Sequence, residues 1–224
     1  MTGNDLIEIV RDLIKDEKAP YLWSDATILR YLQKGEREMC ERTHVLIDPA
    51  VAFTATVTTP PTFTLADNVL RVYAVRVAAN STPLSRLRST AYGIHMQDTV
   101  GEPKTFSTDL GHKKVTLYPA PDVEYAMEGI CAITPDNPVT SGVDSELPPE
   151  HHEELAGYAA YRCLITNDVD GERVGTANEF RDNWGEYLRD LKRDIYRFRT
   201  GDKLVLQNWT GARNGGAANI RVGT

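Results

Sequence analysis

The sequence predicts an α+β protein that is mainly a helical bundle of two N-terminal and two C-terminal helices, with an inserted antiparallel β region and a flexible C-terminal tail. Three observations support this class. Apolar residues recur at helical spacing in residues 1–48 and 145–198, the two parts of the expected bundle. Alternation and Pro/Gly turns in residues 49–144 predict a β-rich region with one short helix. Residues 199–224 are rich in glycine and are expected to form an extended tail.

Two amphipathic helices are predicted in the N-terminal part. The apolar positions of the first are Leu6, Ile9, Val10, Leu13 and Ile14. This helix is expected to end near Lys18, because Pro20 disfavours a helical conformation at the residue before it. The second helix follows Trp23, starts with Ser24 as its N-cap and runs to about Arg42. We expect the two helices to form an antiparallel pair.

The β region begins with strict alternation of apolar and polar residues over positions 51–57. Further strands are expected at residues 62–65, 69–78, 104–107, 114–118 and 125–133. The last three are predicted to form an antiparallel meander. Between them and the earlier strands, Thr82 and Pro83 are suited to start a short helix that ends near Gln97. Residues 135–142 break all periodicity and end the β region.

Two helices are predicted in the C-terminal part. The first runs from about residue 150 to 165, with an apolar stripe of Leu155, Tyr158, Ala159, Cys163 and Leu164. The second has apolar residues at Ala177, Phe180, Trp184, Leu188, Leu191, Ile195 and Phe198. Each large apolar side chain buried there contributes roughly 1.5–3 kcal/mol. We therefore expect this pair to pack against the N-terminal pair.

Composition excludes several classes of protein. The chain has 224 residues, 41% hydrophobic and 25% charged, which is typical of a folded globular protein. Its 25 Lys+Arg against 32 Asp+Glu give a net charge of −7, so binding of nucleic acid through bulk positive charge is not expected. Cys40, Cys131 and Cys163 form no CxxC pair, which disfavours a disulfide framework or a zinc ribbon. We expect a soluble protein with no signal peptide and no membrane contact.

Chemistry-bearing motifs are scarce. The densest group of potential metal ligands is His151, His152, Glu153 and Glu154. Adjacent histidines on a helix point roughly 100° apart and lack the i, i+4 spacing of a metal site, so a solvated first helical turn is the favoured interpretation. The folded region has no phosphate-binding glycine loop and no GxSxG nucleophile elbow. The sequence therefore predicts no catalytic residue, no metal and no cofactor, although a hydrolase with a dispersed site stays an alternative.

Charge is distributed unevenly along the chain. Residues 122–154 contain nine acids and no Lys or Arg, whereas residues 199–224 carry a net charge of +3 from four bases and one acid. Two interpretations stay open: solvated surface, or complementary charges that set the contact with a neighbouring subunit or partner. The acidic residues assigned to such an interface are Asp136, Asp144, Glu146 and Glu150. The tail also holds an apolar cluster of Leu204, Val205, Leu206 and Trp209.

The order of these features resembles that of the head-to-tail connector, or adaptor, proteins of tailed bacteriophages and prophages. The likeness covers residues 6–198. It is carried by the second helix that opens with Trp23-Ser24-Asp25, the LYPAPD run at residues 117–122, the LPPEHH run at residues 147–152, and the two helices that follow. The resemblance implies a virion structural protein rather than an enzyme.

More specific expectations also follow from the resemblance. It implies a ring of twelve subunits beneath the portal protein that extends the DNA channel, lets DNA pass without specific binding, and offers a platform to the next neck or tail protein. The β region would face the tail, and the protein would be found in the virion neck after assembly in the host cytoplasm. The C-terminal segment would bind the portal through Leu204, Val205, Leu206, Trp209, Arg213 and Arg221. The alternatives are another neck or tail-completion protein of similar layout and a cytoplasmic binding module.

Overall fold

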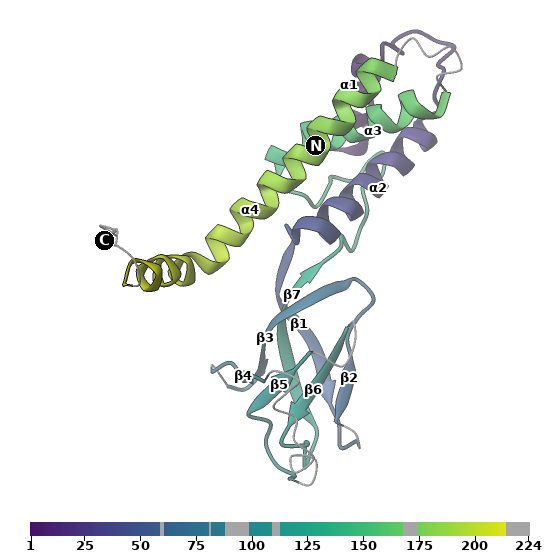
Figure 1. The fold of residues 1–224 in the computed structure, drawn as a ribbon. Helices are drawn as coiled ribbons and strands as arrows, with labels where there is room; N and C mark the ends of the chain where they lie inside the picture. The colour runs from purple at the N-terminus through teal and green to yellow at the C-terminus, as the bar shows by residue number, and fades with distance from the viewer. Residues whose placement is uncertain (59–60, 81, 88–98, 109–112, 168–173, 214–224) are drawn as a thin grey trace.

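The computed structural model places a helical unit at one end of an elongated molecule and a β unit at the other (Figure 1). It describes residues 1–58, 61–80, 82–87, 99–108, 113–167 and 174–213, with side chains to Arg197. Each unit has its own hydrophobic core. The chain passes from the helical unit into the β unit and back again, so the β unit is an insertion between helices.

The helical unit begins with α1 (Gly3–Ile14) and α2 (Asp25–Thr43). Thr2 and Asp5 form a capping box at the start of α1, and Ser24 accepts a hydrogen bond from the Thr27 amide at the start of α2. The chain returns through the 3₁₀ helix η3 (Pro149–His151) into α3 (His152–Asn167) and then α4 (Val174–Arg213).

The predicted bundle of two N-terminal and two C-terminal helices is wrong, although the α+β class holds. Helix α3 packs against α1, α2 and α4, so it is the centre of the unit and not one member of a C-terminal pair. The physical reason lies in its composition. Its buried side chains are His152, Leu155, Ala156, Tyr158, Ala159, Ala160, Cys163 and Leu164. These positions span more than one face of the helix, and a helix that is apolar on several sides is stable only when neighbours cover each side.

In the described residues, the β unit consists of seven strands in two sheets. The strands are β1 (Ile47–Ala55), β2 (Thr62–Thr64), β3 (Val69–Val77), β4 (Ser85–Arg86), β5 (Thr105–Ser107), β6 (Lys114–Tyr118) and β7 (Tyr125–Ile133). One sheet has the order β1-β7-β3 and the other β2-β6-β5-β4. Side chains of both sheets, among them Phe106, Leu117 and Met127, make one core.

Two expectations for the β region are wrong. β5 and β6 pair as predicted, but β7 leaves that sheet and lies between β1 and β3, so there is no three-stranded meander of β5, β6 and β7. Met127, Gly129, Cys131 and Ile133 lie on one face of β7 and are buried, whereas Ala126 and Ile130 on the other face are exposed, so β7 is central in its sheet but buried mainly on one face. The predicted short helix after Pro83 is replaced at its start by β4, which pairs in parallel with β5. The rest of that helix, residues 88–97, lies outside the described residues.

The predicted extended tail is also wrong over most of its length, because α4 continues to Arg213. The helical spacing of apolar residues does not stop at Phe198. Val205 follows Phe198 after seven residues and Trp209 follows Val205 after four, which keeps all three on one side of a helix. Gly201 and Gly211 each cost a helix only about 1 kcal/mol, which is not enough to end it. Residues 214–224 lie outside the described residues.

Candidate interaction surfaces

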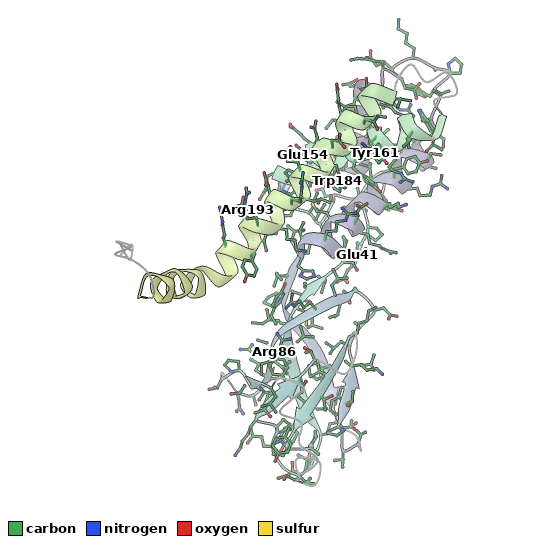
Figure 2. All side chains as sticks on the ribbon, in the orientation of Figure 1. Glu41, Arg86, Glu154, Tyr161, Trp184 and Arg193 are labelled. Atoms are coloured by element: carbon green, nitrogen blue, oxygen red, sulfur yellow. The ribbon has the colours of Figure 1, made fainter. Side chains whose placement is uncertain are left out.

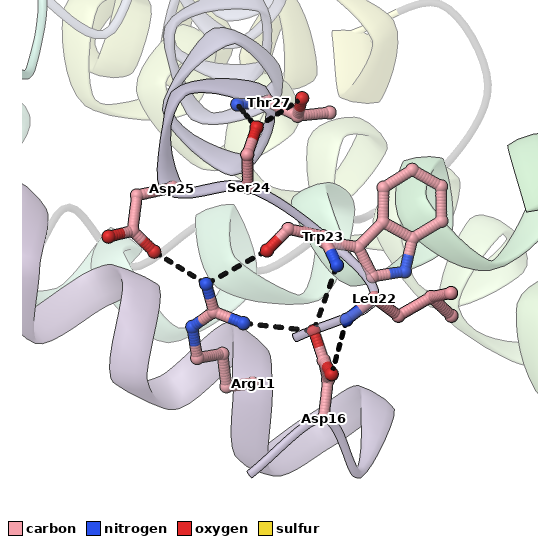
Figure 3. A network of polar contacts seen from close by, with 7 residues as sticks. All are labelled: Arg11, Asp16, Leu22, Trp23, Ser24, Asp25 and Thr27. Atoms are coloured by element: carbon pink, nitrogen blue, oxygen red, sulfur yellow. Dashed lines mark hydrogen bonds and ion pairs between the residues drawn. The ribbon is translucent and has the colours of Figure 1, made fainter. Parts of the chain in front are cut away.

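Arg11 fixes the connection between α1 and α2 (Figure 3). Its guanidinium is buried and donates hydrogen bonds from Nη1 to Asp16 Oδ2 at 2.9 Å and from Nη2 to the Trp23 carbonyl at 2.9 Å. The same Nη2 lies 2.5 Å from Asp25 Oδ1. The Tyr21 ring covers the guanidinium at 3.8 Å. One cation therefore joins the end of α1 to the start of α2.

Asp16 completes this connection by accepting hydrogen bonds from two backbone amides. The donors are the Leu22 amide at 2.9 Å and the Trp23 amide at 3.1 Å (Figure 3). These contacts bury the Trp23 side chain in the helical core and leave Ser24 free to cap α2. The Trp23-Ser24-Asp25 run thus has a structural role in the helical unit.

A buried carboxylate, Glu36 of α2, holds the segment that returns from the β unit. It is 0% exposed and accepts hydrogen bonds from the Val139 amide, at 3.0 Å, and from the Ser145 hydroxyl. Burial raises the pKa of Glu36 above its usual value. Gln33, one turn earlier, donates to the Val139 carbonyl at 2.9 Å. The segment between β7 and η3 is therefore attached to α2 at defined points.

The four acids assigned to an interface do not form one cluster. Glu146 accepts hydrogen bonds from the amides of Asp136 and Asn137, each at 3.0 Å, and Asp136 accepts one from the Asn68 side chain. These two acids therefore close their own loop. Asp144 lies against the N-terminus, 3.5 Å from the Met1 amine, and its side chain is 70% exposed. Glu150 lies on η3 and is exposed.

The LYPAPD run forms the ordered turn between β6 and β7. The Ala120 amide donates to the Thr99 carbonyl at 3.0 Å, and the Gly101 amide donates to the Ala120 carbonyl at 2.8 Å. The Tyr125 hydroxyl donates to Asp122 Oδ1 at 2.7 Å, and this bond raises the pKa of Tyr125 to about 12. The turn carries the chain from one sheet to the other.

The sequence predicted that the two histidines lie on a solvated first helical turn, and this prediction is wrong. His151 and His152 are 7% and 1% exposed. His151 Nδ1 lies 2.5 Å from the Tyr187 hydroxyl, and His152 Nε2 lies 2.9 Å from the Leu147 carbonyl. Because η3 precedes α3, both rings turn towards the core, and burial lowers the pKa of His151. Within the described residues, no three His, Cys, Asp or Glu side chains are grouped to hold a metal ion.

Helix α4 extends far beyond the helical core. Its last buried side chain among the described residues is Leu188, and Leu191 packs partly against the core. The helix then runs on to Arg213, over a length of about 33 Å at 1.5 Å per residue. Figure 1 shows this part leading away from both units. We call residues 189–213 the α4 arm.

The residues expected to bind the portal lie at the far end of the α4 arm or after it. Leu204, Val205, Leu206, Trp209 and Arg213 are in the helix, on the part whose side chains are not described. Arg221 lies outside the described residues. No helix in the described ranges combines the length and the apolar character needed to span a membrane.

Comparison with protein families matches residues 1–205 of this chain to the model of the SU10 adaptor protein. The chain belongs to the SU10 adaptor protein family. This confirms the expectation of a phage adaptor that the order of its elements suggested. Comparison with curated proteins finds no match. The family match includes both units and the first part of the α4 arm.

Proposed function

We propose that this SU10 adaptor forms a ring beneath the portal, extends the DNA channel and joins the capsid to the next neck or tail protein. The observation that supports this most directly is the α4 arm, a long helix that leaves its own core. A helix of this length with an apolar stripe gains stability by packing against something else. An elongated molecule with a helical unit, a β unit and an arm has separate surfaces for separate partners.

The portal is the proposed partner of the end of the arm. Trp209, with Leu204, Val205 and Leu206, is the proposed apolar anchor, and Arg213 and Arg221 are the proposed charged contacts around it. Aromatic anchors of this kind usually dominate the binding energy of an interface. The β unit lies at the opposite end of the molecule from the helical unit (Figure 1) and is the proposed contact for the next neck or tail protein.

The ring is proposed to contain twelve copies of this chain. A closed ring requires head-to-tail contacts between two different surfaces of each subunit. Asp136, Asp144, Glu146 and Glu150 are the acids proposed for such a contact; all four are exposed, and Asp136 and Glu146 also accept hydrogen bonds from nearby residues. A net charge of −7 suits a channel through which DNA passes without specific binding, because acids outnumber the bases that would retain phosphates.

Deletion of residues 204–224 tests the role of the arm. Among the described side chains, the core residues of both units all lie before this segment, so the truncated protein is expected to keep the fold of both units and its unfolding midpoint. It is expected to lose attachment to portal-bearing capsids, measured by co-sedimentation. A shorter deletion of residues 214–224 leaves α4 intact and removes only Arg221 of the proposed contacts, so it is expected to lose much less attachment than the longer deletion. Undiminished attachment of the longer deletion would contradict the proposal.

A further inference from the structure

We propose that the basic first half of the α4 arm, residues 189–203, docks on the acidic start of α3 in a second copy of this chain. The surface it contacts is formed by Glu150, Glu153 and Glu154 and the pocket beside them. The inference rests on the proposed ring and assigns its head-to-tail contact to particular residues. The far end of the arm stays available to the portal.

Charge complementarity supports a second copy as the occupant. Residues 189–203 contain six bases and three acids, a net charge of +3. Residues 1–188 contain 17 bases and 29 acids, a net charge of −12. Arg193 and Arg197 on the arm are 56% and 64% exposed, and among the described side chains their ion pairs are with Asp190 and Asp194 of the same helix. Such exposed pairs are weak, so the bases are available to a partner.

The acidic side of the contact has carboxylates without partners. In the described part of the chain, Glu150, Glu153 and Glu154 make no ion pair or hydrogen bond through their side chains. Glu154 is partly buried, and its burial together with the charge of Glu153 raises the pKa of Glu154. A cation placed here would relieve the repulsion between the two neighbouring carboxylates.

A pocket beside these carboxylates supplies an apolar contact. It has a volume of about 180 Å³ and is lined by Leu13, Gly157, Phe180 and Trp184, with Glu153, Glu154 and Asn183. The apolar floor of this pocket can take up an apolar side chain, and the carboxylates that line it can pair with a base close to that side chain in sequence. Ile195, between the bases of the arm and half-buried in the free chain, has this character.

The same subunit cannot fill its own pocket with its own arm. Phe180 and Trp184 of α4 line the pocket, and the arm begins at Arg189 on the same continuous helix. A helix rises 1.5 Å per residue, so each residue of the arm lies farther from the pocket than the one before it. Figure 2 shows Glu154 beside the first part of α4 and Arg193 farther along it towards the free end. The arm therefore reaches such a pocket only on another copy.

A charge-exchange experiment tests this contact. The arm variant carries Arg193→Glu and Arg197→Glu, and the pocket variant carries Glu153→Lys and Glu154→Lys. Each alone places like charges together, so each is expected to lower the number of copies per portal on purified particles at least about tenfold. An equal mixture of the two variants is expected to return to within about twofold of the wild type, because alternating subunits restore opposite charges at every contact.

The controls separate this contact from the other proposed ones. Glu8→Lys with Glu17→Lys makes the same change of charge as the pocket variant, at exposed positions elsewhere, and is expected to behave as the wild type. If the arm variant fails and the mixture does not rescue it, the arm bases contact the portal or DNA and the inference is overturned. If the wild-type protein itself is absent from particles, the proposed function fails. The contact is then tested by sedimentation of the purified variants, alone and mixed. If the mixed variants do not associate with each other, the inference is overturned.

Discussion

At the scale of single residues, two buried charged groups hold the helical unit together where its chain segments meet. Arg11 joins α1 to the start of α2, and Glu36 holds the segment after β7. The sequence did not reveal either role. Both are charged residues on amphipathic helices, where solvent exposure is the usual outcome, and the groups that bury Glu36 lie about a hundred residues away in the chain.

Glu36 gives a prediction with a defined pH dependence. Glu36→Ala leaves the Val139 amide and the Ser145 hydroxyl without their acceptor, and is expected to lower the free energy of unfolding by about 2–4 kcal/mol in urea titrations. Glu36→Gln keeps an acceptor and a donor at this place and is expected to cost less.

The pH dependence of the comparison follows from the raised pKa of Glu36. Because the folded protein binds the proton more tightly than the unfolded chain, the wild type loses stability as the pH rises from the usual carboxyl pKa of 4.5 through the raised value. The stability of Glu36→Gln relative to the wild type is therefore expected to increase over that range and to stay constant above it. An unchanged difference from pH 4.5 to 8 would show that burial of Glu36 does not govern its ionisation.

At the scale of elements, periodicity predicted the positions of the helices and most strands, because the spacing of apolar residues is a local property. Packing was predicted less well. The central place of α3 and the sheet change of β7 depend on which faces distant elements cover, and no local pattern contains that information. The continuation of α4 was missed because Gly201 and the many polar residues after it were given more weight than the continuing apolar spacing.

The end of the α4 arm gives a prediction at this scale. Trp209→Ala is expected to weaken binding to portal-bearing capsids more than Arg213→Ala, because a desolvated aromatic anchor usually contributes more than a charge at the rim of an interface. Binding curves from co-sedimentation measure both variants, and circular dichroism shows whether α4 is intact. Equal losses, or a larger loss for Arg213→Ala, would contradict an apolar anchor.

At the scale of the whole molecule, the order of elements was more informative than any single site. No catalytic motif was found, yet the sequence of helices, β insertion and two short runs resembled an adaptor, and the family match over residues 1–205 confirmed it. The acidic surface was predicted only as a composition. Its division into Asp136 and Glu146, which close a loop, and the unpaired Glu150 requires the folded positions of the backbone amides.

The copy number in the particle tests the central proposal most directly. Quantitative mass spectrometry of purified particles measures the number of copies of this chain relative to the portal protein. A ring of adaptor subunits that matches the portal is expected to give a ratio close to one. Absence of the chain from particles, or a ratio far below one, would contradict a ring bound directly to the portal.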